Sequence, residues 1–385
     1  MGLFVQQRGG TVLQTDLEAG RTPPGRYDIA TVPGDGVGPE VSRAAIQVLQ
    51  HAVGNDVVID FTSHDAGAEC YVKTGDAFPG EALQACKTAH AVLHGAAGLP
   101  DVLYPDGTEA GQDFSMQIRA ALDLYANIRP IRLMEGAPRR LAAIEPGQMD
   151  FTIVRENTEG LYAARSGGNL LRGEVATDTL VITRKGIERI VHRAAKIAQN
   201  GIGAPADGVK RVTIVDKANV LRSYAFFREV ADEVLAGYPS LAVDHVIVDA
   251  MTVHMLERPE LFDVVVCENI FGDILSDLGA AMMGGMGLAP SGETGDKHGM
   301  FQGSHGSAPD IAGLGLANPI ACILSGAIML DWLGEKHGDE RLTVAAGRIR
   351  SATEAVLAEG QQITPDIGGE GSTSGCADAI CAALG

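Results

Sequence analysis

The 385-residue sequence has no long apolar segment, few aromatic residues (5%) and no excess of positive charge. No run approaches 18 uninterrupted apolar residues; the nearest, Ile320–Leu330, contains Ser and Gly, which argues against a transmembrane helix. Met1–Gly10 lacks the charged-then-apolar order of a signal peptide. The net charge of −19 gives no basis for binding nucleic-acid phosphates. We therefore expect a soluble, cytoplasmic protein that binds neither nucleic acid nor membrane.

The cysteine pattern supports neither disulfides nor a zinc site. The six cysteines, which show no C-x-x-C pair and no zinc-ligand spacing, are Cys70, Cys86, Cys267, Cys322, Cys376 and Cys381. This pattern is typical of reduced, partly buried thiols in a cytosolic enzyme. A chain of 385 residues is long enough for two or three domains and can bury a full core without cross-links.

The order of apolar and polar residues predicts an α/β fold. Residues 1–26 are rich in Gly and Pro and are expected to form an extension before the first core strand. Apolar runs predict strands at Tyr27–Val32, Ala89–Leu93, Met149–Val154, Val212–Asp216, Ala242–Asp249 and Phe262–Cys267. Helical spacing predicts helices at Glu40–His51, Lys185–Asn200, Ser223–Ala236, Gly272–Met283, Ala317–Leu333 and Leu342–Glu359. This alternation favours a largely parallel sheet covered by helices.

A glycine-rich turn follows the first predicted strand. It reads PGDGVGPE at Pro33–Glu40, and it does not match the dinucleotide fingerprint G-x-G-x-x-G because position 39 is Pro. A strand-to-helix turn with a proline at the start of the helix explains the same residues. We therefore reject a Rossmann site at this turn.

Three aspartates form a candidate metal site. Asp273 and Asp277 share one face of a predicted helix because they are four residues apart, and Asp249 ends another predicted strand. Three carboxylates suit Mg²⁺ or Mn²⁺. Spacing alone equally allows Asp273 to be a helix cap and Asp277 a surface residue.

Other candidates stand beside predicted strands. Arg119, Arg129 and Arg155 follow apolar residues and could bind carboxylates, although each alone could be a surface ion pair. Lys217 follows a strand and could act as a base, and Tyr162 could donate a proton. Taken singly, these two could equally be ordinary residues.

A loop of small residues, His305–Gly313 (HGSAPDIAG), is followed closely by Asn318. Small residues let the backbone approach a ligand, and Asp310 could accept hydrogen bonds from an adenosine ribose while repelling a 2′-phosphate. Considered alone, this loop could be an ordinary polar loop.

These motifs together resemble the β-decarboxylating dehydrogenases, the family of isocitrate, 3-isopropylmalate, homoisocitrate and tartrate/D-malate dehydrogenases. The resemblance covers about residues 27–385 and rests on GDGVGPE, IRAALDLYANIRP, IVRENTEGLY, VDKANV, VDAMT, FDVVVCENIFGDILSD and HGSAPDIAG followed by ANP. It implies a two-domain fold that binds the dinucleotide without a Rossmann motif. The cofactor-binding domain would comprise 27–124 plus 284–385, and 125–283 would form the substrate, metal and dimerisation domain.

The resemblance also implies roles for individual residues. Arg119, Arg129 and Arg155 match the substrate carboxylate clamps, and Asp249, Asp273 and Asp277 match the metal ligands. Lys217 matches the base that takes the C2 hydroxyl proton, and Tyr162 the acid that protonates the enolate. His305, Gly306, Asp310, Ile311 and Asn318 match cofactor contacts, and Asp310 favours NAD. A homodimer is implied, with each active site borrowing Lys217 and Asp249 from the partner subunit.

Two departures from the family pattern bear on cofactor contacts and substrate. Relatives usually carry Glu where this chain has Gln302. Six and four residues before Arg119, isocitrate-using relatives carry Ser and Asn where this chain has Asp113 and Ser115, and isopropylmalate enzymes usually carry Leu at the second position. The resemblance thus implies that Asp113 and Ser115 bind the C3 group of the substrate. We therefore expect NAD- and Mg²⁺/Mn²⁺-dependent oxidative decarboxylation of a small 2-hydroxy acid, a 3-substituted (R)-malate of the 3-isopropylmalate type. The alternatives are isocitrate/homoisocitrate or tartrate/D-malate dehydrogenase activity and, more remotely, a non-catalytic regulatory subunit.

Overall fold

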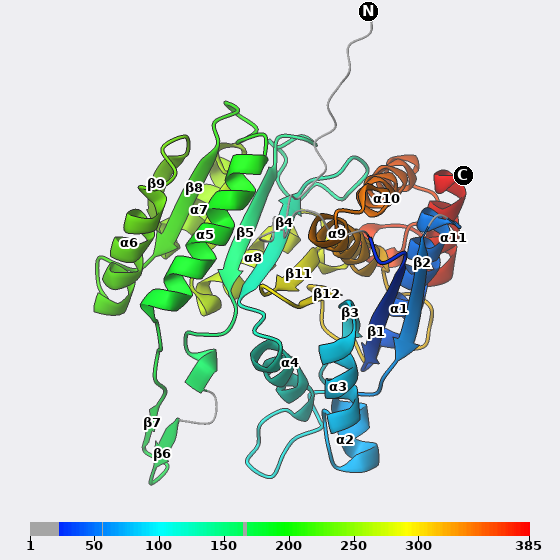
Figure 1. Ribbon diagram of the computed structural model, residues 1–385, viewed down its shortest axis with the longest axis horizontal. Coiled ribbons are helices and arrows are strands. Elements are labelled where there is room, and N and C mark those ends of the chain that lie inside the picture. The colour runs from blue at the N-terminus through cyan, green and yellow to red at the C-terminus, as the bar shows by residue number, and fades with distance from the viewer. Residues whose placement is uncertain (1–22, 56, 165–167) are drawn as a thin grey trace, which may run out of the picture.

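A ten-stranded sheet runs through the computed structural model, which describes residues 23–55, 57–164 and 168–385 (Figure 1). Its strand order is β2-β1-β3-β12-β11-β4-β5-β10-β8-β9. The strands are β1 (Arg26–Gly34), β2 (Val58–Ser63), β3 (Ala91–Ala96), β4 (Ala126–Arg132), β5 (Asp150–Glu156), β8 (Arg211–Asp216), β9 (Ala242–Ile247), β10 (Val264–Cys267), β11 (Pro290–Thr294) and β12 (Gly299–Gly303). β6 (Asn169–Leu171) and β7 (Val175–Thr177) form a separate antiparallel pair. Residues 1–22 of the expected extension lie outside the described residues.

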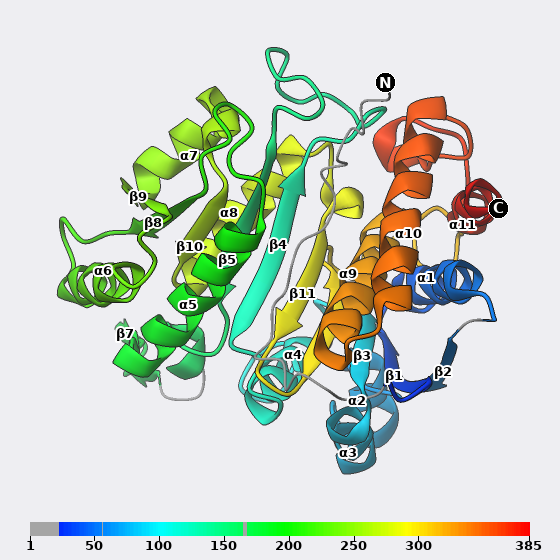
Figure 2. The ribbon, with the colours of Figure 1, turned by 45° about the horizontal axis from the view of Figure 1, so that its top comes forward.

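Helices pack along the sheet, as Figures 1 and 2 show. They are α1 (Gly38–Val53), α2 (Ala68–Thr74), α3 (Gly80–Thr88), α4 (Ala110–Ala121), α5 (Arg184–Asn200), α6 (Arg222–Leu235), α7 (Val248–Glu257), α8 (Asn269–Met282), α9 (Ile320–His337), α10 (Glu340–Glu359) and α11 (Thr373–Leu384). α9 contacts β3, β11 and β12, whereas α5 and α8 both contact β5 and β10. The predicted α/β fold with a mostly parallel sheet is confirmed.

The sheet brings together strands that are far apart in the sequence. β11 and β12 lie between β3 and β4, so late segments of the chain complete the half that holds β1 to β3. The other half consists of β4, β5, β8, β9 and β10. This order is compatible with a division into 27–124 plus 284–385 and 125–283, which stays a prediction.

The strand direction changes in the middle of the sheet. β11 pairs antiparallel with both β12 and β4, and β4 pairs antiparallel with β5, whereas the remaining neighbours in this sheet are parallel. In the register, Glu293 of β11 pairs with Asn127 of β4, which in turn pairs with Arg155 of β5. Directly paired residues point to the same face of a sheet, so these three polar side chains form one row across the middle strands.

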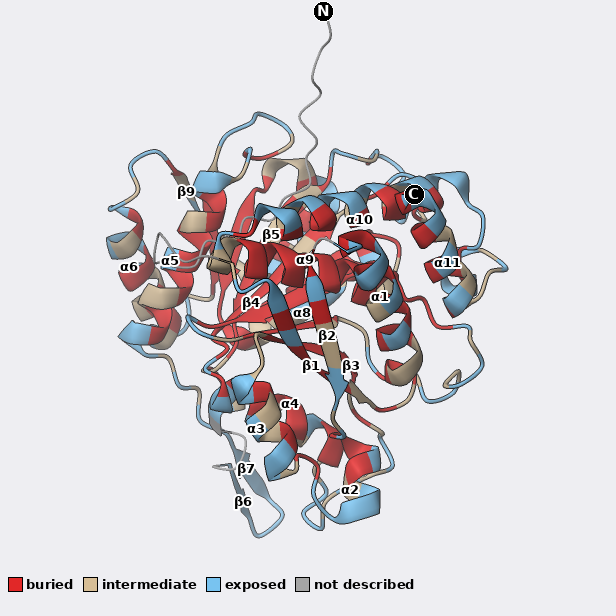
Figure 3. Ribbon diagram, turned by 45° about the vertical axis from the view of Figure 1, so that its right-hand side comes forward, coloured by how far each residue is buried: buried red, intermediate tan, exposed pale blue. Residues whose placement is uncertain are grey.

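The core of the β1–β3 half depends on α9. Each residue from Ile320 to Gly334 in this helix is buried, as Figure 3 shows. Such a helix is apolar on all sides because it packs between the sheet and other helices. Among the described residues, no helix is both long enough and apolar enough to cross a membrane.

The glycine-rich turn after β1 connects several segments of the chain. The buried carboxylate of Asp35 accepts hydrogen bonds from the backbone N–H groups of Ala68, Glu69 and Gly98 at 2.8–2.9 Å. The next residue, Gly36, has φ +57°, and a Cβ there would lie 2.0 Å from the carbonyl oxygen of Ser307. Glycine is therefore required for the turn to touch the loop that contains HGSAPDIAG.

Three local predictions need correction. Asp249 does not end a strand; it lies in the first turn of α7, because β9 stops at Ile247. Arg119 does not follow a strand but lies near the end of α4. α8 begins at Asn269, earlier than predicted, and its cap is the side chain of Glu268, which accepts a hydrogen bond from Ile270 N. Asp273 therefore is not the helix cap.

Candidate active site

A cavity of about 470 Å³ opens beside the centre of the sheet. It is lined by Thr108, Glu109, Gln112, Met116, Arg119, Arg129, Arg155, Tyr162 and Asp273. These residues come from α4 and the loop before it, from β4 and β5, from the segment after β5 and from α8. The structure thus brings together five of the residues predicted from the sequence: the three arginines, Tyr162 and Asp273.

Arg119 is held by a carboxylate that the sequence analysis did not single out. Its Nε and Nη2 atoms donate to the two carboxylate oxygens of Glu293, each at 2.8 Å. Asn157 Nδ2 also donates to Glu293, at 2.9 Å, and the Glu293 side chain is completely buried. Burial opposes the charge of Glu293, but Arg119 outweighs it and lowers the pKa of Glu293 to about 2. The two residues form a buried, bidentate ion pair.

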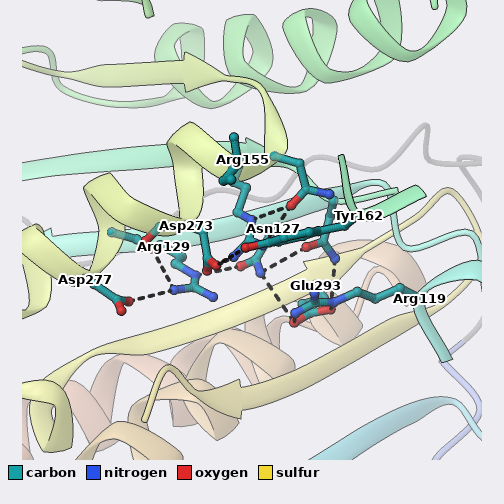
Figure 4. A network of polar contacts seen from close by, with 12 residues as sticks. Arg119, Asn127, Arg129, Arg155, Tyr162, Asp273, Asp277 and Glu293 are labelled. Carbon is teal, nitrogen blue, oxygen red and sulfur yellow. Dashed lines mark hydrogen bonds and ion pairs between the residues drawn. The ribbon is translucent and has the colours of Figure 1, made fainter. Parts of the chain in front are cut away.

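Arg129 and Arg155 are the other cations of the cavity (Figure 4). Arg155 is 1% exposed and forms an ion pair with Asp273, while its Nε and Nη2 donate to Asn269 Oδ1. Arg129 is 6% exposed and bonds to neutral groups, Ser276 Oγ at 2.7 Å and Asn127 Oδ1 at 3.2 Å.

Arg129 has less counter-charge than the other two arginines. Its closest carboxylate is Asp277, at 3.7 Å, and that side chain is 61% exposed. Burial, followed by the charge of Arg155, lowers the pKa of Arg129 to about 10. Buried cations with incomplete pairing are costly, so an anionic ligand in the cavity would be stabilised beside Arg129.

α8 carries two of the three predicted metal ligands, Asp273 in the cavity lining and Asp277 one helical turn later. Tyr162 donates from its hydroxyl to Asp273 Oδ2 at 2.9 Å, and Figure 4 shows both beside the arginines. Burial, opposed by Arg129 and reinforced by the charge of Asp273, raises the pKa of Asp277. Two carboxylates one helical turn apart would be stabilised by a cation between them.

Lys217 and Asp249 lie away from this cavity. They form an ion pair with each other, Lys217 just after β8 and Asp249 in the first turn of α7, and neither lines the cavity. In residues 23–55, 57–164 and 168–385, no group of three or more His, Cys, Asp or Glu side chains is placed to hold a metal. One chain therefore offers Asp273 and Asp277 but not the third predicted ligand.

The predicted cofactor residues lie in the loop between β12 and α9. Asp310 is exposed, and no hydrogen bond or ion pair engages its side chain among the described residues. His305 Nδ1 lies 3.0 Å from the carbonyl oxygen of Gly306, and its buried Nε2 has no hydrogen-bond partner there. Asn318 is buried and donates to Asp366, and Ile311 is half-buried. An exposed acid and an unpaired imidazole nitrogen fit a loop that receives a polar ligand.

The structure does not bring Asp113 and Ser115 into the cavity. Asp113 accepts hydrogen bonds from Tyr104 and Gln117, and Ser115 is buried. The residues of α4 that line the cavity are Gln112, Met116 and Arg119. The contact of Asp113 and Ser115 with the substrate therefore stays a prediction.

Glu293, Gln112 and Met116 were missed by the sequence analysis. A signal for Glu293 exists, because a charged residue stands inside the short segment PSGET, which the structure buries completely. Its partner Arg119 is 174 residues away, so the sequence alone does not reveal the pair. The helical face of α4, read from Arg119 backwards, would have indicated Met116 and Gln112 along with Ser115.

Comparison with known proteins agrees with this geometry. Residues 28–381 match the family model described as isocitrate/isopropylmalate dehydrogenase. The chain is 42% identical over 359 residues to isocitrate/homoisocitrate dehydrogenase of Thermus thermophilus, covering 93% of this chain and 98% of that one. It is 39% identical over 367 residues to a probable tartrate dehydrogenase/decarboxylase of Agrobacterium vitis, with coverage of 93% and 98%.

Two further relatives extend the comparison. The chain is 40% identical over 355 residues to 3-isopropylmalate/3-methylmalate dehydrogenase of Methanocaldococcus jannaschii, covering 92% and 98% of the two chains. The crystal structure of isocitrate dehydrogenase from Methylococcus capsulatus superposes with a TM-score of 0.81 at 35% identity, covering 93% and 99%. The chain thus belongs to the isocitrate/isopropylmalate dehydrogenase family and is a decarboxylating dehydrogenase, an oxidoreductase of a family that works with nicotinamide dinucleotides.

Proposed function

We propose that this enzyme carries out NAD- and Mg²⁺/Mn²⁺-dependent oxidative decarboxylation of a 3-substituted (R)-malate of the 3-isopropylmalate type. The observation that carries the proposal is the cavity with three buried arginines, Tyr162 and Asp273 around one space. A malate brings two carboxylates, and guanidinium groups bind carboxylates through paired hydrogen bonds. Arg129, whose charge is the least neutralised, is the strongest candidate to receive one of them.

The carboxylates of α8 fit a hard divalent cation, although one chain is incomplete. Asp273 and Asp277 supply two oxygen ligands on one helical face, and Asp249 is the third residue of the proposed set. A bound Mg²⁺ or Mn²⁺ would supply Lewis-acid stabilisation of negative charge on substrate oxygens, and bound NAD⁺ would accept a hydride. Because Asp249 lies away from the cavity beside Lys217, we infer that the partner subunit of a homodimer supplies both residues.

Exposed apolar side chains support such a dimer. α7 exposes Val253 and Leu256, α8 exposes Ile274, and the segment after Lys217 exposes Val220 and Leu221. Leu170, Leu171 and Val175 of the β6–β7 pair are also exposed. Large apolar side chains left exposed on neighbouring elements are typical of a surface buried by a partner subunit.

The residues of the chain divide the proton transfers between them. Lys217 of the partner subunit takes the proton of the C2 hydroxyl while the hydride leaves C2, which yields a 3-carboxy-2-oxo acid. The arginines hold the carboxylates and so fix the orientation of C2 and C3. Loss of CO₂ leaves an enolate, and Tyr162 delivers a proton to C3 to give the 2-oxo acid.

The α4 face of the cavity bears on the substituent at C3. Gln112 is polar and uncharged, Met116 is apolar, and the neighbouring Glu109 is acidic. A third substrate carboxylate would find no additional cation on this face and would approach a like charge. We therefore infer an uncharged C3 substituent that is small or moderately polar. The names of the relatives leave isocitrate/homoisocitrate and tartrate/D-malate as alternatives.

A substrate panel tests the proposal. The purified enzyme, with NAD⁺ and Mn²⁺, is mixed with malate, tartrate, isocitrate, homoisocitrate and 3-alkylmalates, and NADH absorbance is followed. We expect a 3-alkylmalate to give the highest kcat/KM. Gln112→Ala and Met116→Ala should change the order of preference, whereas Gln117→Ala, on the exposed side of the same helix, should not. Isocitrate as the best substrate would refute the uncharged substituent, and no NADH from any compound would refute the proposed activity.

A further inference from the structure

Behind Arg119, the side chains of Glu293 on β11 and Gln302 on β12 contact each other on one face of the sheet. Gln302 of β12 pairs in register with Ser291 of β11, two residues before Glu293, so both side chains point to the same face. Gln302 Nε2 donates a hydrogen bond to Glu293 Oε1 at 2.7 Å. Gln302 is the residue at which the family pattern leads one to expect Glu.

The carboxylate of Glu293 is surrounded by donors. Oε1 accepts from Arg119 and Gln302, and Oε2 accepts from Arg119 and Asn157. Each oxygen therefore has two donors within 2.9 Å, and the side chain has no contact with solvent. A fully satisfied buried network allows one orientation of its members, so the plane of the Arg119 guanidinium is fixed by Glu293.

A carboxylate at position 302 would be incompatible with this network. If both groups were ionised, two acceptor oxygens would lie 2.7 Å apart in a buried position where the amide now supplies the hydrogen. Two carboxylates at that separation avoid ionising together, and one retains a proton. The amide of Gln302 supplies the donor without a second negative charge, which explains why this chain departs from the family pattern here.

We propose that Glu293 and Gln302 act as a positioning pair for Arg119, orienting its guanidinium toward a substrate carboxylate, and that Glu293 requires an uncharged donor at position 302. The proposal rests on the proposed function of Arg119 in binding substrate. Neither residue lines the cavity, so the pair acts through Arg119 and not through contact with the substrate.

The pH dependence of KM in the variant Gln302→Glu tests the proposal. In Gln302→Glu, a proton shared between the two carboxylates at low pH would imitate the amide donor, and its loss at high pH would leave like charges in contact. The charged or titratable groups around the pair are Arg119 on α4, Arg129 on β4, Arg155 on β5 and His94 on β3. The arginines keep their charge over this range and His94 stays neutral, so the shared proton dominates the change.

The experiment compares full-length variants by KM, kcat and thermal unfolding from about pH 6 to about pH 9, and by calorimetric binding of a 3-alkylmalate. Gln302→Glu should raise KM for the best substrate by about tenfold near pH 9 and by less near pH 6. The change in kcat should be smaller than the change in KM. The double variant Glu293→Gln with Gln302→Glu, which exchanges the two residues, should have a KM closer to that of wild type than Gln302→Glu alone has. Gln302→Met, which lacks both donor and charge, should raise KM without pH dependence.

A matched control separates the pair from a general effect of added charge. Gln47 donates to Asp378 at 2.7 Å on the exposed surface, and Gln47→Glu should change neither KM nor its pH dependence. Wild-type KM in Gln302→Glu at every pH, or in Gln302→Met if the first variant does not fold, would overturn the proposal, as would an exchange variant no better than Gln302→Glu. Binding of a 3-alkylmalate by wild type without turnover of any compound in the panel would overturn the proposed function alone, whereas absence of 3-alkylmalate binding would overturn both.

Discussion

The hydroxyl of Tyr162 donates a hydrogen bond to Asp273, so the proposed proton donor directly contacts a proposed metal ligand. Burial, reinforced by the charge of Asp273, raises the pKa of Tyr162, which keeps the hydroxyl protonated. Removing this hydroxyl takes away the proton source for C3 but leaves the arginines in place. Tyr162→Phe should therefore reduce kcat by about 100-fold or more while changing KM much less.

Mixing two inactive variants tests whether active sites are shared. Lys217→Met should abolish turnover, because the C2 hydroxyl then has no base. If Lys217 and Tyr162 of one site come from different subunits, heterodimers of the two variants contain one intact site and should recover part of the activity. The measurement is NADH formation after co-refolding, with heterodimers identified by differently sized tags. Heterodimers as inactive as their parents would show that each site uses one chain.

Chelation should stop the reaction reversibly. EDTA should abolish turnover, and Mg²⁺ or Mn²⁺ should restore it, because carboxylates are the proposed ligands. Asp277 is exposed, so Asp277→Asn should raise the metal concentration for half-maximal activity by at least about tenfold without changing the melting temperature. Asp378→Asn, on a distant surface, is the control. Full activity in chelator would remove the metal from the proposal.

Cofactor preference should follow Asp310. Its unpaired carboxylate would repel the 2′-phosphate of NADP⁺ and accept hydrogen bonds from the ribose of NAD⁺. We expect NAD⁺ to exceed NADP⁺ in kcat/KM by about 100-fold, with a smaller ratio at high salt because the residue is exposed. Asp310→Ser should reduce the ratio. Equal use of both cofactors by wild type would contradict the prediction.

Acid should destabilise the protein partly through His94. Burial lowers the pKa of this imidazole from 6.5 to about 4, and its Nδ1 contacts Val32 O at 2.7 Å. The unfolded state therefore binds more protons between these values, and the free energy of unfolding should fall by roughly 3 kcal/mol as pH decreases through this range. In urea titrations, His94→Gln should lose less stability than wild type, whereas the exposed His51→Gln should behave as wild type. Equal losses for all three proteins would contradict the assignment.

The repeating strand-and-helix pattern was predictable because it depends on local periodicity. β8, predicted as Val212–Asp216, and α5, predicted as Lys185–Asn200, each begin one residue earlier in the structure. The start of α7 was not predictable, because the apolar run Ala242–Asp249 continues through the end of β9 at Ile247 into the helix. Local periodicity cannot distinguish a buried strand from the first turn of a helix that follows it.

The candidate site was predictable only where a residue belongs to a recognisable motif. Arg129, Arg155, Tyr162 and Asp273 meet in the cavity as the motifs suggested. Glu293 was not predicted, since its role depends on the pairing of β11 with β4 and on a partner in α4. Asp113 was assigned to the substrate by its position relative to Arg119, whereas the α4 residues that line the cavity are Gln112, Met116 and Arg119.

The strand order also has a consequence for synthesis on the ribosome. β1, β2 and β3 emerge first, yet β12 and α9, which cover and extend their half of the sheet, are translated about two hundred residues later. β4, β5, β8, β9 and β10, with α5 to α8, are complete before then and can fold as neighbours in sequence. We expect protease to cleave the first hundred residues of nascent chains stalled near residue 290 more readily than the strands made after them. Apolar strands that wait for a late helix are exposed to aggregation, so newly made chains should depend on chaperones until α9 has left the exit tunnel.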